Sequence, residues 1–182
     1  MPNIVREELW RHPGFPGMIV VTTNAVITER GFLVMGRGAA QQAKRRIPGI
    51  DTECALVIRE STRSTWSCPA PTGEMAQDAY YDECMREDDD PYSGVGYYFR
   101  EVRKPTDKKV GFGIFQVKVH FTQRADLSLI HRSASMLTLY CHRHPETQVR
   151  MNYPGIGAGR LPRAKIEPLL TDLPDTVTIC YR

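Results

Sequence analysis

One uninterrupted run of apolar and β-branched residues constrains the fold more than any other feature of the chain. It extends from Met18 to Thr23, and a run without polar alternation is typical of a strand buried on both faces. Residues 24–38 contain three glycines and are expected to form a loop. Residues 39–46 predict a helix, which Pro48 and Gly49 end. A strand, a loop and a helix in this order predict an α/β fold.

The later part of the chain also alternates strands and helices. Asp126 is a good N-cap for a helix. The apolar face expected of that helix consists of Leu127, Ile130, Ala134, Leu137 and Cys141. Strands are expected over residues 55–59, 110–119, 149–152 and 176–181, and a short helix over residues 164–170. This alternation predicts a central sheet covered by helices.

Residues 61–109 differ from the rest of the chain. They include the acidic run from Glu87 to Asp90 and show no sustained apolar period. We interpret them as an excursion inserted into the core, not as a second domain. The 182 residues are therefore expected to form a single domain over residues 1–182.

Composition excludes several classes of protein. The net charge of +3, from 24 basic and 21 acidic residues, is too balanced to indicate nucleic-acid binding by itself. The five cysteines are scattered and odd in number, so a disulfide framework is not expected. No apolar run approaches the ~20 residues that span a bilayer, and no secretion signal precedes the first strand. These features predict a cytoplasmic protein without a membrane partner.

Metal binding is not expected either. The nearest approach to a ligand cluster is Cys141-His142-Arg143-His144, and structural zinc usually requires cysteine pairs that this sequence lacks. We interpret the segment as the end of a helix. The chain is expected to need no cofactor.

Two glycine-rich segments carry the chemistry. They are Met35-Gly36-Arg37-Gly38-Ala39 and Gly155-Ile156-Gly157-Ala158-Gly159, and each stands between a predicted strand and a predicted helix. Glycines allow the backbone to approach a ligand closely, and the start of a helix offers unpaired N–H groups to an anion. Neither segment reads GxGxxG, and no P-loop ending is present. The pair predicts a pyrophosphate site of another kind.

The two segments and their surroundings resemble the signatures of macro domains. The residues that carry the first signature are Ile19 to Asn24 and Val34 to Lys44, and those that carry the second are Tyr153 to Leu161. The resemblance is to compact macro-like proteins of phages and bacteria, which share the strand Phe115 to Lys118 and the helix start Ala125 to Leu127. It covers residues 4–59 and 110–181.

This resemblance implies a three-layer α/β/α fold with a mixed sheet, and a cleft that binds ADP-ribose or a related NAD-derived nucleotide. Glu8, or its neighbour Glu7, would accept the adenine amino group, and Tyr153 or Tyr181 would cover the base. Asn24 would face the distal ribose. The ligand-binding residues implied as a set are Glu8, Thr23, Asn24, Met35, Gly36, Arg37, Gly38, Gly155, Ile156, Gly157, Ala158, Gly159, Arg160 and Tyr181.

Three functions remain open. The first is a pure binding module for ADP-ribose or an ADP-ribosylated partner. The second is hydrolysis of an ADP-ribosyl bond or of ADP-ribose 1″-phosphate, with Lys118 and Asn24 as the candidate catalytic residues; the aspartate that assists such a lysine in one branch of macro domains is missing from Ala158-Gly159-Arg160. The third is recognition of modified nucleic acid by a basic rim formed by Arg37, Arg45, Arg46, Arg160 and Arg163.

Overall fold

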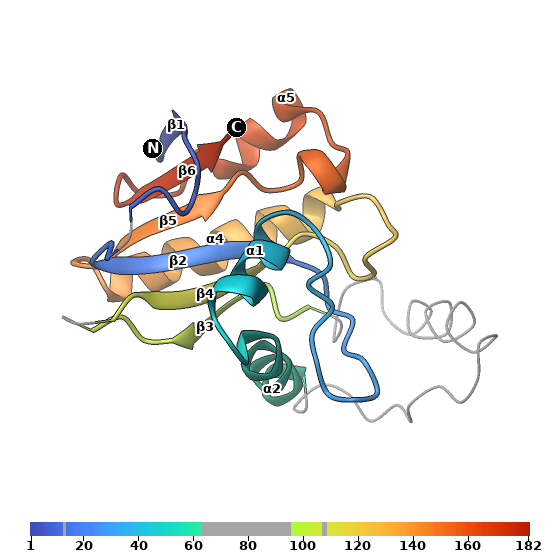
Figure 1. The fold of residues 1–182 in the computed structure, drawn as a ribbon. Coiled ribbons are helices and arrows are strands. Elements are labelled where there is room, and N and C mark those ends of the chain that lie inside the picture. Colours follow the sequence, from blue (N-terminus) through green and yellow to red (C-terminus); the bar gives the residue numbers. More distant parts are fainter. Residues whose placement is uncertain (13, 63–95, 107–108) are drawn as a thin grey trace.

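The computed structural model describes residues 1–12, 14–62, 96–106 and 109–182. These residues form a six-stranded mixed sheet with helices on both sides (Figure 1). The strand order is β1 (Asn3–Arg6), β6 (Val177–Tyr181), β5 (Gln148–Asn152), β2 (Gly17–Thr23), β4 (Gly111–Gln116) and β3 (Phe99–Arg103). Every pairing is parallel except that of β3 with β4. The predicted α/β class is confirmed.

Strand β2 lies at the centre of the sheet and is buried on both faces, as the sequence predicts. Its register pairs Met18 to Thr23 with β4, and its first half pairs with β5. Met18 and Val20 pack into the core on one side of the sheet, whereas Ile19 and Val21 pack into the core on the other. Both cores therefore depend on this strand.

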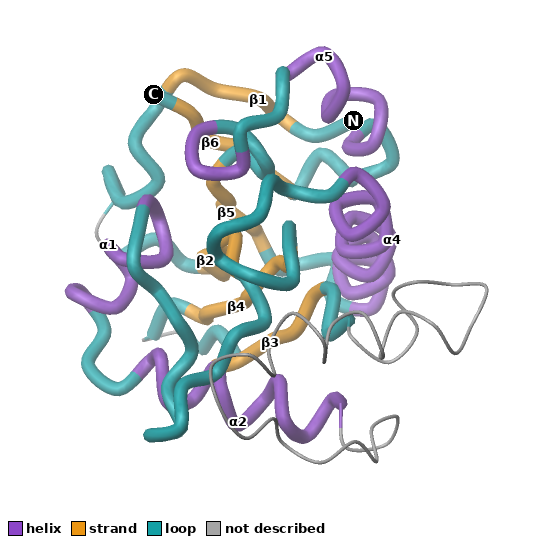
Figure 2. The backbone as a smooth tube through the Cα atoms, turned by 90° about the vertical axis from the view of Figure 1, so that its right-hand side faces the viewer, coloured by secondary structure: helices purple, strands orange, loops and turns teal. Residues whose placement is uncertain are grey.

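The helices are divided between the two faces. Helices α1 (Gly38–Arg46) and α2 (Ile50–Thr62) contribute to the core that contains Ile19, and α4 (Leu127–Arg143) contributes to the core that contains Val20. The short α5 (Arg163–Ile166) joins the α4 side. Figure 2 shows the sheet between α1 and α4. None of the described helices is long and apolar enough to cross a membrane.

Helix α4 begins as predicted. The Asp126 side chain accepts hydrogen bonds from the backbone N–H groups of Ser128 and Leu129, at 2.8 and 3.1 Å, which satisfies two donors that the helix cannot pair. Leu127 is an exception to the predicted apolar face, because it is 36% exposed. The other four predicted positions are buried. Leu127 is the first residue of the helix.

The predicted strand over residues 55–59 is wrong, because these residues lie within α2. Their β-branched side chains favour a strand locally, but Ile50, Cys54 and Ile58 are all buried at helical spacing. Packing of that helical face against the sheet outweighs local preference. The apolar residues counted from residue 50 onward recur every four positions, which indicates a helix.

The predicted excursion over residues 61–109 is too long. Phe99–Arg103 forms the antiparallel edge strand β3, and Tyr97 is fully buried just before it. The β3 residues are mostly half-buried, so they lack the apolar run that marks a central strand. The acidic run of residues 87–90 lies outside the described residues.

Two other differences concern the ends of strands. Strand β1 at the sheet edge is absent from the sequence prediction, because its four residues are only partly buried. Strand β4 ends at Gln116, before the predicted residue 119. Beyond Gln116 the regular pairing is interrupted, because the carbonyl of Val117 accepts the N–H of Asp126 at 2.7 Å and the N–H of Ala25 donates to Val119 instead, at 2.8 Å.

The three cysteines in the described residues, Cys54, Cys141 and Cys180, are buried free thiols. Helix α4 ends at Arg143, so the Cys141-His142-Arg143-His144 segment is a helix end, as predicted. No three histidine, cysteine or acidic side chains come together within the described ranges to hold a metal ion.

Substituting Leu137 tests the packing of α4 on the sheet. Leu137 is fully buried, whereas Leu139 on the same helix is 41% exposed. Leu137→Ala should lower the free energy of unfolding by about 2–5 kcal/mol through lost burial and a residual cavity. Leu139→Ala should change it by less than about 0.5 kcal/mol. Urea unfolding of both variants measures the difference, and equal losses would contradict the packing described.

Candidate functional site

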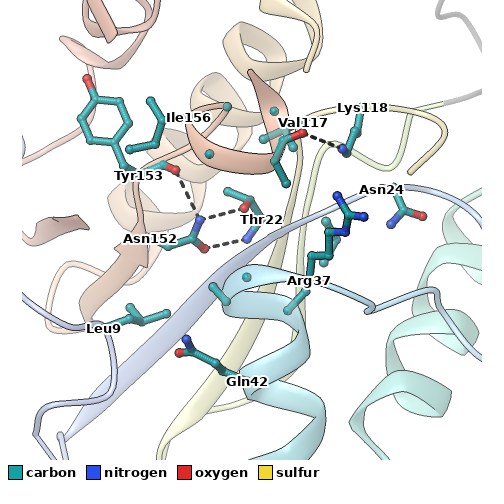
Figure 3. Close-up of a pocket in the computed structure, with 18 of the residues that line it drawn as sticks. Leu9, Thr22, Asn24, Arg37, Gln42, Val117, Lys118, Asn152, Tyr153 and Ile156 are labelled. Atoms are coloured by element: carbon teal, nitrogen blue, oxygen red, sulfur yellow. Dashed lines mark hydrogen bonds between the residues drawn. The ribbon is translucent and has the colours of Figure 1, made fainter. Parts of the chain in front are cut away.

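A cavity of about 720 Å³ opens at the carboxyl ends of the parallel strands. Loops meet at this edge in open α/β sheets, and a volume of ~300–1,000 Å³ is typical of small-molecule sites. Residues from five places in the sequence line it: the segment after β1, the end of β2 with the start of α1, the end of β4, the loop after β5, and the end of β6. Figure 3 shows Leu9 and Tyr153 across the opening from Asn24 and Lys118.

The start of α1 presents unpaired backbone N–H groups to the cavity. The N-cap residue Arg37 makes no side-chain capping bond, and Gly38 adopts a positive φ of 58°. The first N–H groups of a helix have no partner within it, and here Gly38, Ala39 and Ala40 all line the cavity. This end of α1 is therefore suited to an anion.

The loop after β5 presents a second set of unpaired backbone N–H groups to the cavity. It forms the short 3-10 helix η1 (Gly157–Gly159), with φ values of 61° at Gly157 and 57° at Arg160. Within the described chain, the N–H groups of Ile156, Gly157 and Ala158 find no acceptor, whereas those of Gly159 and Arg160 are paired inside the turn. Successive N–H groups in such a turn form an anion-binding nest.

Glycine is required in this loop because it packs closely on its surroundings. A Cβ on Gly159 would lie 2.9 Å from the Cβ of Ala125, and the N–H of Ala125 donates to the carbonyl of Gly159 at 2.9 Å. A Cβ on Gly155 would lie 2.8 Å from Cδ1 of Ile130, and its φ is 74°. These contacts fix the position of the nest relative to α4.

Three cations surround the same part of the cavity. Lys118, Arg37 and Arg160 all line it. Burial lowers the pKa of Lys118, and the positive charges of Arg160 and Arg37 lower it further. Because both arginines affect the pKa of Lys118, the three positive charges lie close together. An anion placed among them would relieve their repulsion.

The amine of Lys118 is bonded to the backbone. The side chain is only 8% exposed. Its Nζ donates to the carbonyls of Phe121, Gln123 and Ala158, at 3.0, 3.2 and 3.3 Å. Lys118 therefore lies in a buried position just beyond the end of β4, at the wall of the cavity. In this arrangement the amine connects the nest to the loop that follows β4.

Asn24 also supports the loops. Its Nδ2 donates to the carbonyl of Val34 at 2.8 Å, and its Oδ1 accepts the N–H of Val26 at 2.8 Å. It lines the cavity, with one N–H and one lone pair left for a ligand. The neighbouring Thr23 hydroxyl is hydrogen-bonded to the hydroxyl of Tyr97, which donates to the carbonyl of Asn24 at 3.1 Å.

Sequence reasoning missed Asn152 on the floor of the cavity. Its Oδ1 accepts the N–H of Thr22 at 2.9 Å, and its Nδ2 donates to the hydroxyl of Thr22 at 2.7 Å (Figure 3). The two bonds join the ends of β5 and β2. The available signal was an asparagine at the end of a predicted strand, directly before a glycine-rich loop. The other missed lining residues include Leu9, Gln42, Phe121, Thr122 and Arg182.

Acidic and aromatic side chains line the end of the cavity near β1 and β6. Glu7 accepts from Nη2 of the buried Arg150 at 2.6 Å, and this hydrogen bond lowers the pKa of Glu7. Glu8 is paired with Arg182. Beside them, the rings of Tyr153 and Tyr181 meet edge to face, with centroids 6.3 Å apart. Both glutamates and both tyrosines line the cavity.

The structure thus gathers almost the whole predicted set around one cavity. Met35 is the exception: it is 3% exposed and packs with α1 and α2 in the core, so its side chain does not line the opening. Of the predicted basic rim, Arg37 and Arg160 line the cavity, whereas Arg45, Arg46 and Arg163 do not.

Solved structures with the same fold are macrodomains. The macrodomain of Mycobacterium tuberculosis DarG superposes with a TM-score of 0.63 at 20% identity, over 100% of this chain and 97% of that one. A macrodomain protein from Streptomyces coelicolor superposes with a TM-score of 0.57 at 15% identity, over 100% of this chain and 99% of that one. Thermosipho africanus DarTG in complex with ADP-ribose superposes with a TM-score of 0.52 at 18% identity, over 91% of this chain and 38% of that one.

No family model and no curated protein sequence matches the chain. The fold is that of the macrodomains, as the resemblance of the two glycine-rich segments implied.

A pair of substitutions tests the close approach of the nest to residue 125. Gly159→Ala should lower the free energy of unfolding by about 1–3 kcal/mol, because the added methyl group collides with Ala125. In an Ala125→Gly background the same substitution should cost at least about 1 kcal/mol less, since the collision is removed. Chemical denaturation of the four proteins measures this coupling. Additive losses would mean that the two residues are not in contact.

Proposed function

We propose that this chain, which has the macrodomain fold, binds ADP-ribose or a closely related NAD-derived nucleotide in the cavity. One observation carries the proposal: two sets of unpaired backbone N–H groups, at the start of α1 and at residues 156–158, line the same cavity. A diphosphate offers acceptor oxygens to both sets at once. Arg37, Arg160 and Lys118 supply positive charge beside them.

The charges of the lining residues give the ligand a direction. Glu7 and Glu8 lie at one end of the cavity, where each is paired with an arginine, and a carboxylate accepts well from the amino group of adenine. Tyr181 at this end is half-buried and offers an apolar face to a base. The distal ribose would then lie toward Asn24 and Lys118, where an amide retains one donor and one acceptor.

The fold neighbour from Thermosipho africanus contains ADP-ribose, which supports this choice of ligand. An ADP-ribosylated protein or nucleic acid would present the same nucleotide to the cavity. Either macromolecule would have to extend from the distal ribose, past Phe121 and Thr122 at the cavity wall.

Binding without turnover fits the geometry of Lys118 better than catalysis. Its three N–H bonds are all directed to backbone carbonyls, so a nucleophilic amine would have to lose a proton and break those bonds. The residue of the nest that faces it is Ala158, which offers a carbonyl and no carboxylate. The lowered pKa of Lys118 is the one feature that favours catalysis.

Calorimetric titration with ADP-ribose tests binding. We expect one-to-one binding, and a loss of at least about tenfold in Gly157→Glu, because the new carboxylate would lie in the anion nest. Gly49→Glu is the matched control: both glycines have a positive φ, 61° and 78°, and both have open space at Cβ, but Gly49 does not line the cavity. NAD, AMP and a cyclic ADP-ribose serve as comparisons. No binding of ADP-ribose would contradict the proposal.

Turnover assays separate binding from hydrolysis. The protein should release no ADP-ribose catalytically from ADP-ribosylated protein or single-stranded DNA, and no phosphate from ADP-ribose 1″-phosphate. Multiple turnovers that Lys118→Ala abolishes, and Lys118→Arg does not restore, would instead establish a lysine nucleophile. Arginine retains the charge and the donors but is not a nucleophile at neutral pH. If turnover occurs and neither substitution changes its rate, the protein is a hydrolase in which Lys118 is not the nucleophile.

A further inference from the structure

Arg163, at the start of α5, packs against both tyrosines at the acidic end of the cavity. Its guanidinium carbon lies 4.6 Å from the ring centroid of Tyr181 and 5.1 Å from that of Tyr153. Both distances are within the ~6 Å over which a cation is attracted to an aromatic face. One guanidinium therefore contacts two rings that are themselves edge to face at an interplanar angle of 87°.

The arginine is held from its other side. Its Nε donates to Oε1 of Glu167 at 2.7 Å, one turn later in the chain. This pair is partly exposed, with 41% and 46% of the two side chains accessible, so by itself it contributes little to stability. Its effect is to restrict the orientation of the planar guanidinium beside the two rings.

Arg163 does not line the cavity, whereas Tyr153 and Tyr181 do. The guanidinium therefore contacts the rings away from the ligand space. Tyr153 is only 3% exposed and is fixed by the core, but Tyr181 is half-buried at the end of β6. Of the two rings, Tyr181 is the one whose orientation depends most on Arg163.

We propose that Arg163 is a positioning residue that holds Tyr181 as a stacking platform and so makes the site prefer a purine base over a pyrimidine. This inference rests on the proposed binding of a nucleotide diphosphate. A ring held in one orientation loses no rotational freedom when the ligand binds. A purine covers more of such a ring than a pyrimidine does, so the benefit of a fixed ring is larger for adenine.

The test compares ADP-ribose with uridine diphosphate ribose, which share the diphosphate and the distal ribose. Titration calorimetry of the whole chain gives both affinities for each protein. Arg163→Gln should weaken ADP-ribose binding by about three- to fivefold, because a partly exposed cation–π contact is lost. It should change the affinity for uridine diphosphate ribose by less than about twofold. The ratio of the two affinities should therefore fall. Arg163→Lys, which keeps the charge without the planar group, should be intermediate.

Lys165→Gln is the matched control. Lys165 lies on the same short helix and is exposed, so its substitution removes one positive charge without touching either tyrosine. It should leave both affinities unchanged. Thermal unfolding of all variants identifies any loss that comes from unfolding, which would lower both affinities alike and leave their ratio intact.

Three results would overturn the inference. An unchanged ratio in Arg163→Gln, with ADP-ribose still bound, would remove the positioning role and leave the proposed function standing. Equal losses in Arg163→Gln and Lys165→Gln would mean that Arg163 acts only as a distant charge on the diphosphate. Failure of the unaltered protein to bind ADP-ribose would overturn the proposed function, and this inference with it.

Discussion

The pairing of β2 with β4 on one side and β5 on the other is the constraint on which the rest of the structure depends. The three strands are parallel, so their carboxyl ends reach the same edge of the sheet. β2 can hold this place because its side chains are apolar on both faces and fill both cores. The loops that follow the three strands then have to meet above that edge. Asn152 reinforces the arrangement through two hydrogen bonds to Thr22.

The cavity that results has a polarity along its length. Backbone donors, Arg37, Arg160 and Lys118 occupy one part, whereas two glutamates and two tyrosines occupy another. The positive part is held in place by backbone contacts: the amine of Lys118 bonds to three carbonyls, and the nest packs on Ala125. A site with preformed donors loses little entropy when an anion binds. Arg163 does not line the cavity, but its guanidinium contacts both tyrosine rings.

Local patterns predicted the elements whose burial is simple. The run from Met18 to Thr23 and the Asp126 cap each have one physical reading, and both are confirmed. The strand predicted over residues 55–59 is wrong because, over only five residues, β-branched side chains in a helix give the same pattern as a strand. No local window brings together the residues that form the edge strands β1 and β3, the bond from Lys118 to Ala158 and the Arg150–Glu7 pair, because they lie far apart in the chain.

The most direct test of the account is the response of individual backbone amides to ADP-ribose, followed by two-dimensional ¹H–¹⁵N NMR during a titration. The account predicts that the largest shifts fall on two sets of N–H groups, those of residues 38–40 at the start of α1 and those of residues 156–158 in the nest. Shifts in one set alone would mean that only one loop holds the phosphates. Shifts confined to residues outside the cavity, such as those of α2 and β3, would contradict the account.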